Sequence, residues 1–295
     1  MNRSSAPATR AVIALAILSL IWGYTWVVMK LAGNYAGPFE FAALRTVFGA
    51  LSLFVALVWR RQPLRLVAPG WTLLLGMLQT AGFTGLSQWA LVSGAAGKTA
   101  VLSYTMPFWI LLLAWPLLGE RLRSWQWLAV AIAFGGLILI LEPWKSHASF
   151  ASETLAIASG LSWGASAIVV KKLRARFQVD LLSLTAWQML FGALALVIVA
   201  VLVPSPPVII NGYLVGAVIY TAFLGTGLAW LLWLYVLDKL PAGIAGMGSL
   251  AVPAVGVLAA WIQIGERPNT AEFSGMLAIA AGLALLAMAN QRQQR

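Results

Sequence analysis

The sequence predicts an all-α polytopic membrane protein, with ten transmembrane helices arranged as two inverted five-helix repeats around a central cavity. Three observations predict this fold. Hydrophobic residues make up 61% of the 295 residues and charged residues only 9%, whereas a soluble domain carries about 25% charged residues. The apolar residues fall into runs of roughly 20, the length that crosses a bilayer. The two halves of the chain also share residues at matching positions.

Ten apolar runs lie between charged or Pro/Gly-rich breaks. Each is expected to be a helix, because unpaired backbone groups cannot face lipid. The first half (residues 1–145) holds the predicted spans 11–29, 39–59, 70–92, 99–118 and 124–141. The second half (residues 146–295) holds the predicted spans 154–170, 181–203, 211–237, 242–264 and 271–289. The first run lacks a small-residue cleavage site and continues into Lys30, so it is interpreted as an uncleaved span.

The positive charges of the loops predict the orientation. Most of the 19 lysines and arginines fall on one side of the predicted membrane, including Arg60, Arg61, Arg65 and the basic residues of 171–176. The loops of the other side carry Lys30, Lys98, Lys145 and Arg267. Because basic loops stay in the cytoplasm, both termini are expected on the cytoplasmic side of a bacterial inner membrane.

An internal repeat relates the two halves. One shift along the sequence aligns Ser103 with Ser249, Pro107 with Pro253, and Gly119-Glu120-Arg121 with Gly265-Glu266-Arg267. A slightly smaller shift aligns Trp22-Gly23 with Trp163-Gly164. Shared apolar composition alone would scatter Leu and Ala matches instead of aligning a proline and a Gly-Glu-Arg turn.

Each repeat holds five predicted spans, an odd number, so the second copy is expected upside down relative to the first. Inverted repeats around a midplane site recur in secondary transporters, because two equivalent halves can open alternately to either side. The repeat therefore favours a transporter that works by alternating access. The alternative is that the duplication only builds a ten-helix bundle.

These motifs resemble the drug/metabolite transporter superfamily (EamA type). The resemblance rests on two five-helix repeats, each with Trp-Gly in its first helix, a proline midway along its fourth and Gly-Glu-Arg at the end of that helix. The richness in aromatic residues is most similar to the bacterial aromatic amino acid exporters of that superfamily. The resemblance implies efflux from a central cavity lined by the first four helices of each repeat. It also implies aromatic and other neutral amino acids as cargo.

Aromatic residues at mid-depth are the first candidates for cargo binding. Trp22 and Trp163 are related by the repeat and lie well inside their predicted helices, although Trp usually prefers the membrane interface. A buried indole needs a partner for its N–H, and stacking on a cargo ring would add about 0.5–1.5 kcal/mol. Trp26 extends the face of Trp22, and Ser166 extends that of Trp163. The alternative is that these aromatic residues only pack helix against helix.

Polar residues at depth complete the predicted binding site. An unsatisfied amide in hydrocarbon costs several kcal/mol, so Gln79 must face a cavity or a neighbouring helix. The other candidates are Phe83, Tyr104, Gln188, Thr226 and Ser249. Proline bends a helix and frees a carbonyl, so Pro107 and Pro253 are either hinges near the site or packing kinks.

Charged residues inside the predicted spans are nearly absent. Arg45 is the one charge well inside a helix, and its guanidinium either binds a cargo carboxylate or pairs with helix ends or Glu40; the structural role is favoured. The turn residues Glu120, Arg121, Glu266 and Arg267 are interpreted as structural ionic groups at helix ends. A carboxylate-based proton relay is not expected, because no Asp, Glu or His lies near the predicted midplane.

Several other functions have little support. The sequence contains no G-x-S-x-G motif and no mid-depth base, so an enzyme is disfavoured. With 0 Cys and 1 His, it also offers no set of metal ligands. No cofactor and no nucleic acid partner are expected, because the basic residues lie in short loops. The expected partners are the lipid bilayer and a small-molecule cargo, with function as a monomer. A multidrug exporter and a channel remain alternatives.

Overall fold

Helices form all the regular secondary structure in residues 5–119, 124–142, 150–239 and 251–293, the part of the chain that this computed structural model describes. In the first half they are α1 (Ser5–Ala32), α2 (Pro38–Trp59), α3 (Pro69–Leu75), the π-helix η1 (Gly76–Gly82), α4 (Phe83–Ser93), α5 (Ala96–Ser103), α6 (Met106–Leu118) and α7 (Ser124–Leu141). In the second half they are α8 (Phe150–Arg176), α9 (Leu181–Leu202), α10 (Gly212–Ile219), the π-helix η2 (Tyr220–Leu228), α11 (Ala229–Lys239), α13 (Ala251–Ile264) and α14 (Thr270–Gln293).

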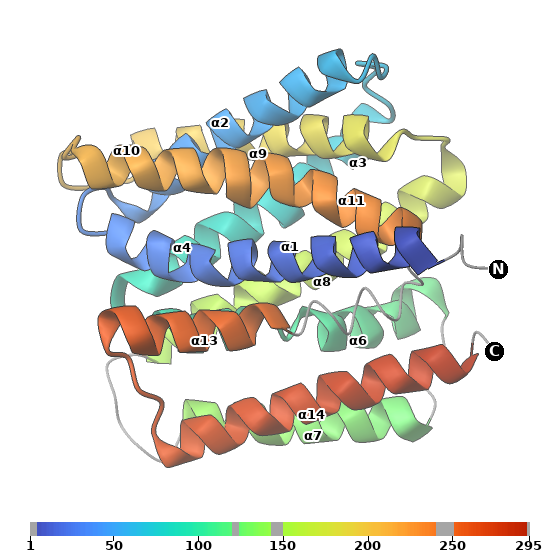
Figure 1. The fold of residues 1–295 in the computed structure, drawn as a ribbon, viewed down its shortest axis with the longest axis vertical. Helices are drawn as coiled ribbons and strands as arrows, with labels where there is room; N and C mark the ends of the chain where they lie inside the picture. The colour runs from blue at the N-terminus through green and yellow to red at the C-terminus, as the bar shows by residue number, and fades with distance from the viewer. Residues whose placement is uncertain (1–4, 120–123, 143–149, 240–250, 294–295) are drawn as a thin grey trace.

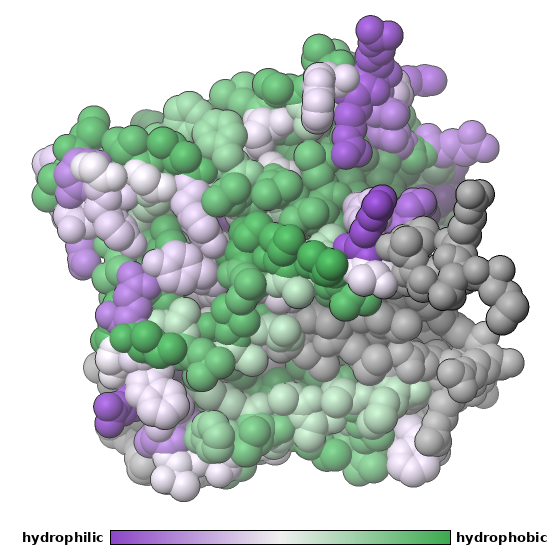
Figure 2. All heavy atoms as spheres, viewed as in Figure 1, coloured by the Kyte–Doolittle hydropathy of each residue, from purple (hydrophilic) through white to green (hydrophobic). Residues whose placement is uncertain are grey.

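The described helices suit a bilayer. Six of the described segments are long and apolar enough to cross one: Thr9–Ala32, Pro38–Trp59, Ala96–Leu118, Phe150–Arg176, Leu181–Leu202 and Gly212–Val236. Apolar side chains also remain on the surface, where Val201 is 79% and Ile262 84% exposed. Figure 2 shows that apolar residues cover the middle of the visible face, while hydrophilic residues gather toward its ends. The chain is therefore a multi-pass membrane protein, because so much exposed apolar area is stable only in lipid.

The helices lie side by side with their axes roughly aligned (Figure 1). The pair α7 and α14 forms one edge of the bundle, and α2 packs against α9 toward the other edge. Between them, α1 contacts α13 and α11, and α8 contacts α4, α5 and α6. The beginning of α1 and the end of α14 lie at the same end of the bundle.

Two predicted spans differ from uninterrupted α-helices. The span expected at 70–92 is α3, η1 and α4, and the span expected at 211–237 is α10, η2 and α11. A π turn forms i→i+5 hydrogen bonds and is wider than an α turn. Close packing accompanies the first of these segments, because a Cβ on Gly76 would lie only 2.5 Å from the carbonyl oxygen of Gln188 on α9.

The span expected at 99–118 is also broken. The helix α5 ends at Ser103, and α6 begins at Met106 with Pro107 in its first turn. Proline is tolerated there because a first-turn N–H has no intrahelical acceptor. Pro253 is buried near the start of α13, and residues 240–250 before that helix lie outside the described residues.

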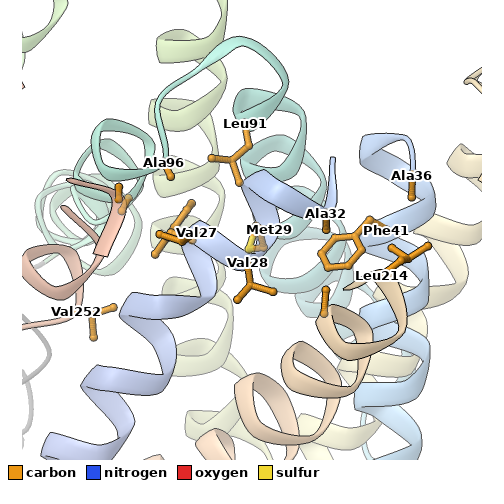
Figure 3. Close-up of a cluster of buried hydrophobic side chains, with 14 of the residues drawn as sticks. Val27, Val28, Met29, Ala32, Ala36, Phe41, Leu91, Ala96, Leu214 and Val252 are labelled. Carbon is orange, nitrogen blue, oxygen red and sulfur yellow. The ribbon is translucent and has the colours of Figure 1, made fainter. Parts of the chain in front are cut away.

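One end of the bundle is closed by an apolar cluster (Figure 3). Val27, Val28 and Met29 at the end of α1 pack there with Phe41 of α2 and Leu91 of α4. Phe41 and Val27 are completely buried. The cluster lies at the end of the bundle opposite to the beginning of α1.

Candidate functional site

A cavity of about 370 Å³ lies inside the bundle, between α1, α2, η1, α4, α8, α9, η2 and α11. Its walls run from Met29 and Arg45, beside the apolar cluster, to Arg174 and Leu181. Arg174 is exposed, so the cavity reaches the surface at the end of the bundle where α1 begins. Its volume falls in the range of small-molecule sites, about 300–1,000 Å³.

Aromatic rings form the wall of the cavity. The indole N–H of Trp22 donates to the carbonyl oxygen of Gly225 in η2 (2.9 Å). Trp230 of α11 contacts both repeat-related indoles: its ring centroid lies 6.2 Å from that of Trp22 and 6.0 Å from that of Trp163. Phe83 meets Trp163 edge to face at 4.8 Å. The predicted pair of tryptophans is thus joined through a third indole, and the backbone of a π-helix accepts the N–H of Trp22.

Trp26 and Tyr104 line the same cavity. Trp26 lies one turn beyond Trp22 and is 4% exposed. Tyr104 lies at the break between α5 and α6, and the break places its ring in the wall. Within the described residues the Tyr104 hydroxyl has no hydrogen-bond partner, so it is free to meet a guest molecule.

The polar candidates divide into satisfied and unsatisfied groups. The Thr80 hydroxyl donates to Oε1 of Gln188 (2.8 Å), and Nε2 of that fully buried amide has no partner. The hydroxyl of Thr226 donates to the carbonyl of Thr221 (3.0 Å). Gln79 lines the cavity and forms no hydrogen bond within the described part of the chain. The side chain of Gln79 is therefore open to a guest, whereas Nε2 of Gln188 is a buried donor without a partner.

Arg45 also lines the cavity. Its Nη1 donates to Sδ of Met29 (2.8 Å), and its Nε is buried without a partner. No ion pair joins Arg45 to Glu40 among the described residues; Oε1 of Glu40 accepts from the Ser205 hydroxyl, and its Oε2 is buried without a partner. Ser205, in the connection between α9 and α10, thus binds the carboxylate that had been considered as a partner of Arg45.

Some predicted residues lie elsewhere. Ser166 is completely buried, and its hydroxyl donates to the carbonyl of Trp163 (2.6 Å) instead of facing the cavity. Pro107 and Pro253 do not line the cavity. Ser249, Glu120 and Arg121 lie outside the described residues.

The second Gly-Glu-Arg turn fixes helix ends. Gly265 has a φ of 71°, the left-handed conformation that glycine adopts after a helix. The Glu266 carboxylate accepts from the backbone N–H of Ala96 (2.6 Å) and of Gly97 (3.4 Å), at the start of α5. Arg267 lies over the Trp261 ring at 5.9 Å. A carboxylate at a helix N-terminus is stabilised by unpaired N–H groups and the helix dipole.

Sequence reasoning missed several residues of the wall. Trp230 and Trp233 of α11 line the cavity, as do Thr84 and Thr185. A signal for Trp230 was present, since it follows the candidate Thr226 by four residues and so falls on the same face of a regular helix.

Comparison with known proteins identifies the family. The model of the EamA-like transporter family matches residues 9–142 and again residues 151–288. The chain belongs to the EamA-like transporter family. The predicted membership of the drug/metabolite transporter superfamily is confirmed, and the family is one of transporters rather than enzymes.

Relatives within the EamA-like family extend over nearly the whole chain. The sequence is 26% identical to the uncharacterized transporter YoaV of Bacillus subtilis (strain 168), covering 93% of this chain and 95% of that protein. It is 24% identical to a probable amino-acid metabolite efflux pump of Escherichia coli (strain K12), covering 92% of each. A crystal structure with 20% sequence identity superimposes with a TM-score of 0.67 over 97% of this chain and 99% of its own, and supports the fold.

Proposed function

We propose that this protein exports small neutral metabolites across the bacterial inner membrane, with aromatic and other neutral amino acids as its cargo. The aromatic wall formed by Trp22, Phe83, Trp163 and Trp230 carries the proposal. Rings that stack on a planar cargo add about 0.5–1.5 kcal/mol each beyond the burial of apolar area. Export as the direction of transport is supported by the relatives that are named efflux pumps.

Alternating access between two inverted five-helix repeats is the proposed mechanism. Exchanging the halves preserves the pattern of helix contacts: α1 contacts α13 while α8 contacts α5 and α6, and α2 contacts η2 while α9 contacts η1. The pairs α2–α9 and α7–α14 map onto themselves. Two equivalent halves of this kind can close one end of the cavity as the other opens.

The conformation described here fits the inward-open state of this cycle. The cavity reaches the surface beside Arg174, in the basic segment 171–176, and positive charge marks cytoplasmic loops. The apolar cluster of Figure 3 closes the other end. Both termini are then cytoplasmic, as the loop charges predict.

Uncoupled movement down a gradient fits the chemistry of the wall. Among the described residues that line the cavity there is no Asp, Glu or His. Proton-coupled exchange through a carboxylate would need a buried acid with a raised pKa. The same lack of acidic groups disfavours a multidrug exporter for lipophilic cations.

Flux from proteoliposomes tests the proposal. Vesicles loaded with labelled amino acids should release phenylalanine and tryptophan with saturable kinetics and no stoichiometric proton current. Trp22→Ala and Trp163→Ala should each lower the flux at least about fivefold, because each removes about 1 kcal/mol or more of ring contact.

Trp59→Ala is the matched control, because Trp59 is 79% exposed at the end of α2 and lies outside the cavity. Its flux should equal that of the parent. Absence of aromatic amino acid flux, or identical flux from all three variants, would refute the proposed cargo. Flux that does not saturate would instead indicate a channel.

A further inference from the structure

Arg45 is a cation without an anion. In the described part of the chain, ion pairs join Lys98 to Glu153 and Glu272, and Lys239 to Asp238; none involves Arg45. A guanidinium carries five N–H donors, and here one of its nitrogens donates to a thioether sulfur, a weak acceptor. Its Nε is buried without any partner. Such a group is costly unless a bound molecule completes it.

The remaining charge in the cavity does not offset Arg45. Arg174 is the other charged residue in the described wall, and it is also a cation. Glu40, the nearest acid in the sequence, does not line the cavity; its Oε1 accepts from the Ser205 hydroxyl, and its Oε2 is buried without a partner. The second half of the chain has Gln188 at the repeat-related position, and Nε2 of this completely buried side chain is another donor without a partner. The wall thus offers buried donors to an anion and no carboxylate to an ammonium group.

We propose that Arg45 is the residue that binds the carboxylate of the cargo, and that the cavity therefore also accepts aromatic carboxylates that lack an α-ammonium group. This inference rests on the proposed function and extends its cargo from neutral amino acids to aromatic acids. A guanidinium binds a carboxylate through two parallel N–H···O bonds. An ammonium group, when present, meets the hydroxyl of Tyr104, the amide oxygen of Gln79 or a ring face.

The depth of Arg45 suits this arrangement. At about 1.5 Å per residue, it lies about 10 Å along α2 from Pro38. Trp22 lies about 15 Å from Ala32 along α1, which runs in the opposite direction. Arg45 is therefore about 5 Å closer to the closed end than the indoles. When the carboxylate of the cargo binds Arg45, the ring of the cargo, a few bonds away, therefore lies at the level of the aromatic wall.

A matched pair of ligands tests the proposal on the purified full-length protein. The ligands 3-phenylpropanoate and 3-phenylpropanamide share a ring and a chain length, and only the first carries a carboxylate. Titration calorimetry should show about tenfold tighter binding of the carboxylate, the ratio expected for a hydrogen-bonded charge. Arg45→Gln, which installs the residue of the repeat-related position, should bring the ratio of the two affinities close to one. Arg45→Lys should retain part of the preference.

Arg60→Gln is the control, because it removes the same charge from the exposed end of the same helix, outside the cavity, and should keep the parent's ratio. Equal affinity of the parent for the two ligands, or a carboxylate preference that survives in Arg45→Gln, would overturn the proposal. The ratio is taken within one protein sample, so partial misfolding of a variant does not change it. Failure of the proposed function is distinct: neither phenylalanine nor these ligands would bind the parent.

Discussion

At the scale of single residues, two glycine–threonine contacts hold the second helix of each half against a π-helix. A Cβ on Gly49 of α2 would lie 2.8 Å from Cγ2 of Thr226 in η2. Gly192 of α9 meets Thr80 of η1 in the same way, and a Cβ there would also lie 2.7 Å from the carbonyl oxygen of Gly76. Both positions lack the space for a methyl group, because backbone and β-branched side chains cannot move aside cheaply.

Gly192→Ala should therefore destabilise the protein by about 1–3 kcal/mol, the usual cost of overpacking. Thermal unfolding in detergent, followed by tryptophan fluorescence, measures the change. Gly135→Ala is the control, because nothing lies within 4 Å of a Cβ at that exposed position of α7. An alanine there should leave the melting temperature unchanged or raise it. Equal melting temperatures for the two variants would contradict the tight contact.

Residues that line the cavity could be predicted from the sequence where the internal repeat places the same residue type at the equivalent position of the other half. Trp22 and Trp163 were found because each marks the other, and both line the cavity. At the shift that aligns Pro107 with Pro253, Trp230 aligns with Thr84 and not with a tryptophan, so symmetry did not indicate it. Ser166 was predicted from helical spacing alone, yet serine hydroxyls within a helix readily bond their own backbone.

At the scale of elements, buried charge ties three helices together near the closed end. Lys98 of α5 forms ion pairs with Glu153 of α8 (2.6 Å) and with Glu272 of α14 (2.8 Å). The side chains of Lys98 and Glu153 are only 11% and 2% exposed. Removing one partner of a buried pair leaves an uncompensated charge, which costs more than the pair itself contributes.

Lys98→Met should consequently destabilise the protein by about 3–5 kcal/mol. Lys239→Met is the matched control, because it removes the exposed ion pair with Asp238 (2.7 Å), and exposed pairs contribute about 0–1 kcal/mol. Denaturation midpoints of the two variants measure the difference. A Lys98 variant as stable as the Lys239 variant would show that the pairs of α5 do not hold the closed end.

The sequence predicted where helices lie more accurately than it predicted their geometry. Apolar runs gave the spans at 39–59 and 124–141 within a residue or so of α2 and α7, because lipid imposes a length. The π-helices were not predicted; each packs closely against a helix of the other half, η1 against α9 and η2 against α2. Hydropathy carries no signal for a single extra residue in a turn.

At the scale of the whole molecule, the positions of the loops permit a test of orientation. The connection after α2 carries Arg60, Arg61 and Arg65, and the connection before α10 lies at the opposite end of α2, where the N–H of Ile209 donates to the carbonyl of Tyr35 (2.7 Å). The chain contains 0 Cys. A single introduced cysteine is therefore a unique label.

Single cysteines at Gln62 and Ile210 should react differently in intact cells. Ile210 is 81% exposed, and Ile210→Cys should react with a membrane-impermeant maleimide added outside. Gln62→Cys lies beside basic residues, which are expected to stay in the cytoplasm, and should react only after the cells are permeabilised. Reaction of Gln62→Cys from outside would invert the proposed orientation.

The two π-helices have a consequence for how the walls can move. A π turn contains one residue more than an α turn. If a π turn converts to an α turn, the extra residue shifts into the next turn of the helix. Every side chain beyond that point then turns by about 100°, without any hydrogen-bonded turn being lost. The carbonyl of Gly225 in η2 accepts the indole N–H of Trp22 on α1. A rotation within η2 would therefore also reorient the Trp22 ring.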